Sequence, residues 1–128
     1  MKKKVLIVVS DYYKNISESL LKSTKKYLNK KTSLKIIKVP GVFEIPVIIS
    51  KNIKKFDGFV AIGCVIKGKT AHFDLISKSV IDAIMNLSID NKKPVGNCIL
   101  TCFNYRQALE RKNKGKEAAF ALNSILYK

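Results

Sequence analysis

Four short apolar runs alternate along this sequence with four segments whose apolar residues recur at helical spacing. We interpret the runs as strands, at residues 5–9, 34–39, 59–66 and 95–101. Strands separated by helices in this way form a parallel sheet, because right-handed crossovers lay helices on its faces. The sequence therefore predicts an α/β fold: a three-layer α/β/α sandwich with a four-stranded parallel sheet in flavodoxin-like topology.

Local signals give the expected positions of the four helices. We expect Asn15 to be the N-cap of the first helix, with Glu18 reaching back to its backbone. A second helix is predicted over residues 43–55, because Pro46 falls in its first turn, where proline is tolerated. The two remaining helices are expected over residues 73–87 and through residues 118–126.

The composition suits one domain with its own core, since 47% of residues 1–128 are apolar and no linker or repeat divides them. The formal net charge is 25 − 9 = +16, which by itself suggests a polyanionic partner. However, the charge comes from 23 lysines and 2 arginines spread along the whole chain, with no RNP, KH or helix-turn-helix signature. We therefore expect no nucleic-acid partner, and a basic nucleic-acid-binding α/β domain stays the alternative from another class.

No membrane segment or metal site is expected. The longest uncharged run, residues 94–105, has 12 residues, whereas a spanning helix needs about 20. The apolar residues 5–9 are too few for a signal peptide, so we expect a cytoplasmic protein. The three cysteines, Cys64, Cys98 and Cys102, form no CxxC pair, and the chain has a single histidine. This disfavours both a disulfide framework and a zinc site.

In open parallel sheets, ligands bind beyond the carboxyl ends of the strands, which here means residues 10–14, 40–44, 66–72 and 101–105. A glycine turn that leads into a helix offers free N–H groups to an anion, and Lys67, Lys69 and Thr70 stand at such a turn. Because lysine is frequent everywhere, an ordinary solvated turn is the competing interpretation. His72, the only histidine, has a side chain suited to proton transfer near neutral pH, although a surface histidine is the alternative.

Two further segments at this edge also carry unusual residues. Glu44 stands at an otherwise apolar helix start, where it either satisfies free N–H groups or accepts hydrogen bonds from a polyhydroxylated ligand. Tyr12 and Tyr13 are suited to stacking on a planar heterocycle, with core or rim packing as the alternative. Cys64 is not expected to be a nucleophile, because a cysteine within an apolar strand is usually a small hydrophobe.

Three blocks of sequence stand out at these strand ends. They are Val-Pro-Gly-Val-Phe-Glu-Ile-Pro at 39–46, Gly-Cys-Val-Ile-Lys-Gly-Lys-Thr-Ala-His-Phe at 63–73, and Gln-Ala-Leu-Glu-Arg at 107–111 with Asn-Lys-Gly at 113–115. In this order and spacing, over nearly the whole chain, they resemble the 6,7-dimethyl-8-ribityllumazine synthase family, transferases of riboflavin biosynthesis. The resemblance implies condensation of 5-amino-6-(D-ribitylamino)uracil with 3,4-dihydroxy-2-butanone 4-phosphate to give 6,7-dimethyl-8-ribityllumazine, phosphate and water, without metal or organic cofactor.

The resemblance also implies a role for each matching residue. His72 matches the proton-transfer histidine, and Tyr12 matches the aromatic ring that stacks on the pyrimidine. Lys69 and Thr70 match the phosphate-binding turn, and Arg111 matches the arginine that clamps the phosphate. Two segments of the family hold the ribityl chain and the uracil ring, largely through backbone groups. The matching residues here are Val42, Phe43, Glu44, Cys64, Val65 and Ile66. The positions that the family supplies from a neighbouring subunit correspond to Asn97 and Lys114.

The chain also departs from the family pattern. Tyr13, Lys67 and Asn97 stand where asparagine, arginine and an aromatic residue are common, so we expect changes in substrate affinity more than in the reaction.

The resemblance implies a homopentamer with sites between subunits, and a riboflavin synthase as a further partner. The short N-terminus and the short loop after Arg111 favour a free pentamer over paired pentamers or a shell. A lumazine- or flavin-binding homologue without catalysis is the second alternative, whereas a receiver domain would need an aspartate at the end of the strand 59–66.

Overall fold

The computed structural model describes residues 2–128, and its four strands form one sheet in the order β2-β1-β3-β4, with every neighbouring pair parallel. The strands are β1 (Lys4–Ser10), β2 (Ser33–Val39), β3 (Gly58–Ile66) and β4 (Val95–Cys102). Each predicted strand lies inside an observed one and falls short by at most one residue at either end. The predicted four-stranded parallel sheet is therefore confirmed.

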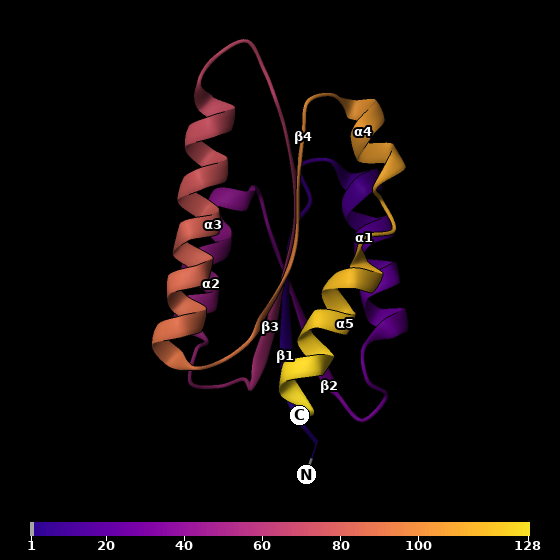
Figure 1. Ribbon diagram of the computed structural model, residues 1–128, viewed down its shortest axis with the longest axis vertical. Helices are drawn as coiled ribbons and strands as arrows, with labels where there is room; N and C mark the ends of the chain where they lie inside the picture. Colours follow the sequence, from indigo (N-terminus) through magenta and orange to yellow (C-terminus); the bar gives the residue numbers. More distant parts are fainter. Residues whose placement is uncertain (1) are drawn as a thin grey trace.

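Helices cover both faces of the sheet. They are α1 (Lys14–Tyr27), the 3-10 turn η1 (Val42–Glu44), α2 (Ile45–Lys51), α3 (His72–Asn91), α4 (Tyr105–Glu110) and α5 (Gly115–Leu126). In Figure 1, α2 and α3 lie on one side of the sheet, and α1, α4 and α5 lie on the other. This arrangement confirms the three-layer sandwich. Over residues 2–128, none of the helices has the length and apolar character needed to cross a membrane.

The start of α1 differs from the prediction, because Asn15 is not its N-cap. The helix begins at Lys14, and the Ser17 backbone N–H donates to the Tyr13 carbonyl oxygen at 3.0 Å. The buried Ser17 hydroxyl also donates to the carbonyl oxygen of Ser10 at the end of β1. These bonds draw the first turn of the helix against the strand, so that tertiary contacts override the local capping signal.

Three other helices also depart from the sequence-based expectation. The α3 helix ends at Asn91, four residues beyond the predicted end at residue 87. The α2 helix ends at Lys51 and not at residue 55, because the Asn52 side chain donates to the Ile48 carbonyl oxygen at 2.8 Å and closes the last turn. The α4 helix was not predicted. Its capping is local and reciprocal: Asn104 Oδ1 accepts the Gln107 N–H at 2.9 Å, and Gln107 Oε1 accepts the Phe103 N–H at 2.7 Å.

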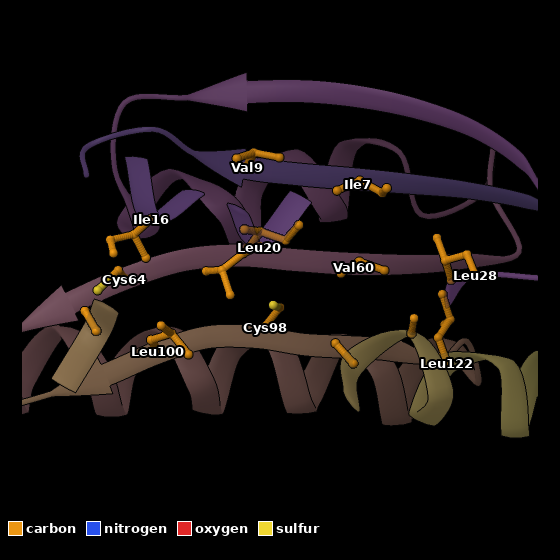
Figure 2. Close-up of a cluster of buried hydrophobic side chains, with 14 of the residues drawn as sticks. Ile7, Val9, Ile16, Leu20, Leu28, Val60, Cys64, Cys98, Leu100 and Leu122 are labelled. Atoms are coloured by element: carbon orange, nitrogen blue, oxygen red, sulfur yellow. The ribbon is translucent and has the colours of Figure 1, made fainter. Parts of the chain in front are cut away.

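The core consists of two apolar clusters, one on each face of the sheet. Successive residues of β1 point to opposite faces, so that Val5 and Ile7 pack toward α1 and α5 while Leu6 and Val8 pack toward α2 and α3. Figure 2 shows the first cluster, in which Ile16 and Leu20 of α1 lie over the sheet, and Leu28, just after α1, lies beside Leu122 of α5. Burial on both faces explains why β1 and β3 are continuous apolar runs, whereas the edge strand β2 is largely exposed and contains Lys35 and Lys38.

Candidate active site

A cavity of about 610 Å³ opens at the carboxyl ends of the strands. In the order β2-β1-β3-β4, the chain continues in opposite directions from β1 and from β3, and such a reversal leaves a crevice where open α/β sheets bind ligands. The lining comes from the ends of β1 and β3, the turns after β1 and β2, and the start of α3: Ser10, Tyr12, Tyr13, Gly41, Val42, Phe43, Cys64, Val65, Ile66, His72 and Ile76.

Aromatic rings form one part of this lining. Tyr12, which is 74% exposed, meets Tyr13 edge-on, with ring centroids 5.0 Å apart and ring planes at 78°. The Tyr13 ring lies in turn 6.2 Å from the ring of Tyr105 in α4. Burial, with a smaller effect of Tyr12, raises the pKa of the Tyr13 phenol, which therefore stays protonated at neutral pH. The arrangement leaves the Tyr12 ring open for stacking on a planar ligand.

The thiol at the end of β3 is buried, as expected for a cysteine in an apolar strand. Cys64 belongs to the cluster that also contains Ile16 (Figure 2), and burial raises the pKa of its thiol to about 12. At neutral pH the thiol is therefore protonated and a poor nucleophile. Among residues 2–128, no three His, Cys, Asp or Glu side chains are grouped closely enough to hold a metal ion.

The segment after β2 places its carboxylate at the helix start. Glu44 Oε1 accepts a hydrogen bond from the Gly41 backbone N–H at 3.0 Å. This geometry favours the first of the two interpretations of Glu44, in which its carboxylate accepts hydrogen bonds from free backbone N–H groups of its own chain. Val42 and Phe43 line the cavity, and Phe43 is 64% exposed. The segment therefore presents apolar side chains and the glycine backbone to a ligand.

The turn between β3 and α3 carries His72 to the cavity. His72 is the first residue of α3, and its backbone N–H donates to the Thr70 hydroxyl oxygen at 3.3 Å. Lys69 and Thr70 are exposed on the turn itself, next to the residues that line the cavity. The Thr70 bond ties the turn to the start of the helix, so the basic turn and the histidine form one continuous structural unit.

Six predicted site residues lie outside the cavity lining of their own chain. Glu44, Lys69 and Thr70 adjoin lining residues along the chain, whereas Asn97, Arg111 and Lys114 come from other elements. Asn97 is on β4 at the open edge of the sheet, where its Oδ1 accepts the Ile99 N–H at 3.0 Å. The Arg111 guanidinium donates to the Gln107 carbonyl oxygen at 3.3 Å, and Lys114 pairs with Glu117 at 3.1 Å. A single chain therefore brings together only part of the predicted set.

Several lining residues were not among the predicted site residues. Tyr13 and Gly41 fall in segments that the strand-end rule selects, and Tyr13 had been considered for stacking. Ile76 lies one helical turn after His72, so i, i+4 spacing on α3 would have found it. Ser10 also falls in a segment that the strand-end rule selects, but its residue type adds no signal, because a serine at the end of a strand is also an ordinary turn residue.

The sheet is flavodoxin-like, and the cavity at its strand ends is lined by tyrosines and by the one histidine of the chain. These features are typical of an α/β enzyme that acts on small molecules, and less so of a polyanion-binding domain. A family model described as 6,7-dimethyl-8-ribityllumazine synthase matches residues 2–127. The chain belongs to the 6,7-dimethyl-8-ribityllumazine synthase family, and it is accordingly a transferase.

Individual relatives agree with this family assignment. A 6,7-dimethyl-8-ribityllumazine synthase of Bartonella tribocorum is 43% identical over 132 aligned positions, which cover 94% of this chain and 87% of the relative. The relative of the same name from Agrobacterium fabrum is 38% identical, covering 95% of this chain and 91% of its own length. A third, from Corynebacterium kroppenstedtii, is 35% identical and covers 92% and 79%. The likeness is therefore spread over nearly the whole chain and is not confined to the motifs.

Proposed function

We propose that this chain condenses 5-amino-6-(D-ribitylamino)uracil with 3,4-dihydroxy-2-butanone 4-phosphate to form 6,7-dimethyl-8-ribityllumazine in riboflavin biosynthesis. The observation that carries the proposal is the position of His72: the only histidine of the chain lines the strand-end cavity of a domain that belongs to this family. The family match over residues 2–127 does not favour the nucleic-acid-binding alternative.

The reaction needs oriented substrates and proton transfer more than it needs a strong nucleophile. The 5-amino group of the uracil attacks the ketone, and imine formation releases one water. Phosphate is also eliminated, and ring closure onto the ribityl-bearing nitrogen releases a second water. Each step moves protons, so a histidine beside the reacting atoms can relay them. Holding the two substrates together supplies much of the remaining acceleration, and we propose no cofactor.

We assign different residues of this chain to the two substrates. We assign Tyr12 to stacking on the pyrimidine ring and His72 to proton transfer. Lys69 and Thr70, on the exposed turn before α3, bind the phosphate with the help of the helix N-terminus. The ribityl chain and the uracil edge lie against the backbone of two segments: Val42, Phe43 and Glu44, and Cys64, Val65 and Ile66. This assignment fits the cavity lining, which contains both segments except Glu44.

A neighbouring copy of the chain would complete the site. Asn97, Arg111 and Lys114 lie outside the cavity lining of their own chain, although the family pattern gives them roles at the substrates. We therefore propose that they act from a neighbouring subunit of a homopentamer, with Arg111 clamping the phosphate. Arginine suits this role because its planar guanidinium binds phosphate oxygens in pairs.

The surface of the single chain is consistent with such an assembly. Large apolar side chains on the face covered by α2 and α3 are more than half exposed: Phe43, Val47, Leu75, Met85 and Ile89. Phe120 and Ile125 on α5 are exposed to a similar extent. Exposed apolar groups favour association, because burying them removes apolar surface from water. We further propose that the enzyme acts in the cytoplasm and that a riboflavin synthase consumes its product.

The decisive experiment mixes the purified protein with both substrates and follows the fluorescent lumazine product over time. We expect product formation well above the spontaneous rate, and native mass spectrometry of the same sample is expected to give five chains. Binding of the lumazine without turnover would instead indicate an inactive homologue. Salt-dependent binding to nucleic acid with no product would indicate the basic-domain alternative.

A further inference from the structure

Two side-chain hydroxyls are buried without a hydrogen-bond partner among residues 2–128, those of Ser10 and Ser77. They differ in position. Ser10 is 1% exposed and lines the strand-end cavity at the end of β1. Ser77 is on α3 and lies outside that lining. Buried hydroxyls in folded proteins are nearly always paired, so an unpaired one at a ligand cavity calls for a ligand partner.

The Ser10 hydroxyl is held on a fixed part of the backbone. The Ser10 carbonyl oxygen accepts the hydroxyl of Ser17, and the next N–H, that of Asp11, donates to the Val39 carbonyl oxygen at 3.2 Å. These two bonds tie the end of β1 to α1 on one side and to β2 on the other. The hydroxyl is therefore a preorganised group and not one that a mobile loop happens to bury.

Its immediate neighbours are the segments that we assign to the ribityl chain and the uracil. A Cβ placed on Gly63 would lie 3.3 Å from Ser10 Cβ and 2.5 Å from Val42 Cγ1, so the side chains of Ser10 and Val42 both pack against Gly63. Val42 begins the segment that follows β2, and Gly63 precedes Cys64 on β3. Ser10 therefore lines the cavity next to the place where these two segments meet.

We propose that Ser10 is a further substrate-binding residue, whose side-chain hydroxyl hydrogen-bonds a hydroxyl of the ribityl chain. A serine hydroxyl both donates and accepts, which matches the hydroxyls of a polyol better than the flat face of the pyrimidine. The aromatic partner for that ring, Tyr12, stands only two residues further along the chain. This inference deepens the proposed function and rests on it.

The test compares Ser10→Ala with the matched control Ser77→Ala, because each removes one unpaired buried hydroxyl. We expect Ser10→Ala to raise the KM for the aminouracil about three- to ten-fold, the value of one hydrogen bond, and to leave the KM for the butanone phosphate unchanged. Ser77→Ala should change neither KM. Both variants should unfold at or above the wild-type temperature, since neither loses a protein hydrogen bond.

A substrate analogue locates the interaction. With a 6-alkylamino analogue that lacks the ribityl hydroxyls, wild type and Ser10→Ala should bind equally in a direct titration. An unchanged KM for Ser10→Ala with the natural substrate would overturn the proposal, and so would a lowered unfolding temperature, which would show a structural hydroxyl. A wild-type protein that forms no lumazine would instead overturn the proposed function, so the two failures are distinguishable.

Discussion

The ammonium nitrogen of Lys67 lies 5.4 Å from the ring centroid of Phe103, a contact that joins the turn after β3 to the turn after β4. The Lys67 backbone N–H also donates to the Cys102 carbonyl oxygen at 2.9 Å, and the Phe73 ring lies 6.4 Å from that of Phe103. Phe103 therefore contacts residues on both sides of the segment 68–72, which contains Lys69, Thr70 and His72.

Removing this ring should loosen the basic turn. We expect Phe103→Ala to raise the KM for the butanone phosphate about two- to five-fold, because an exposed cation–π contact contributes about 0.5–1 kcal/mol. Phe103→Tyr, which keeps the ring, should behave as wild type. Phe120→Ala is the control, since Phe120 is similarly exposed but lies on α5. Steady-state kinetics decide the matter, and equal KM values for all of these proteins would show that the ring has no such role.

His72→Ala tests the proton relay. We expect kcat to fall by about 10²-fold, the lower end of the range for general acid–base catalysis, because orientation of the two substrates is preserved. The KM values should change less than about twofold, since His72 is assigned to proton transfer and not to binding. Stopped-flow fluorescence measures both quantities. A variant with wild-type kcat would remove His72 from the mechanism.

Gly115→Ala tests the contact between α1 and α5. A Cβ on Gly115 would collide with the Leu20 carbonyl oxygen and would lie 2.5 Å from the Thr24 backbone nitrogen, and neither backbone atom can move alone. We expect a loss of about 1–3 kcal/mol in the free energy of unfolding. Gly68→Ala is the control, because a Cβ there meets no atom of residues 2–128 within 4 Å. Denaturant titration measures both variants, and equal stabilities would contradict the contact.

Stability at high pH should depend on the buried thiol of Cys98. Burial raises its pKa from 9.0 to about 12, so above pH 9 the unfolded chain releases a proton that the folded chain keeps. The thiol therefore leaves stability unchanged below about pH 9 and lowers it progressively between pH 9 and 12. Between pH 9 and 10.5 the expected loss is about 1–2 kcal/mol.

The comparison for this prediction is Cys98→Ala, which removes the thiol but keeps the titrating lysines. We expect the variant to be less stable than wild type at pH 8, because it leaves a cavity. Its free energy of unfolding should nevertheless fall less steeply up to pH 10.5. If the free energies of unfolding of the two proteins fall equally with pH, the Cys98 thiol has an ordinary pKa and the prediction is wrong.

Ionic strength should control the proposed assembly. Five chains of +16 would carry 5 × 16 = +80, and their repulsion extends to about 30 Å at 0.01 M salt but only about 10 Å at 0.1 M. We expect sedimentation velocity to show pentamers at 0.15 M salt and smaller species at 0.01 M. An assembly that is the same at both concentrations would mean that the lysines are spaced too widely to oppose packing.

The strands could be predicted closely because burial on both faces makes β1 and β3 continuous apolar runs, and proline breaks stand next to β2 and β4 at Pro40 and Pro94. The helix ends could not, since they depend on which side chains satisfy the free backbone groups, as Asn52 does at the end of α2. Asn15 has the local character of an N-cap, yet the bond from Ser17 to the Ser10 carbonyl starts the helix earlier. The short helix α4 lacks a long apolar period, although Asn104 and Gln107 carry a capping signal that could have revealed it.

By itself, the sequence determined the fold class, the family motifs and the strand ends at which a site would form, because periodicity and turn chemistry are local properties. Only the tertiary structure decided which of those residues meet. It brings Tyr12, Val42, Cys64 and His72 around one cavity, because the strand order reverses between β1 and β3. Arg111 stays outside the lining of that cavity in its own chain, since it follows α4, beyond the last strand β4.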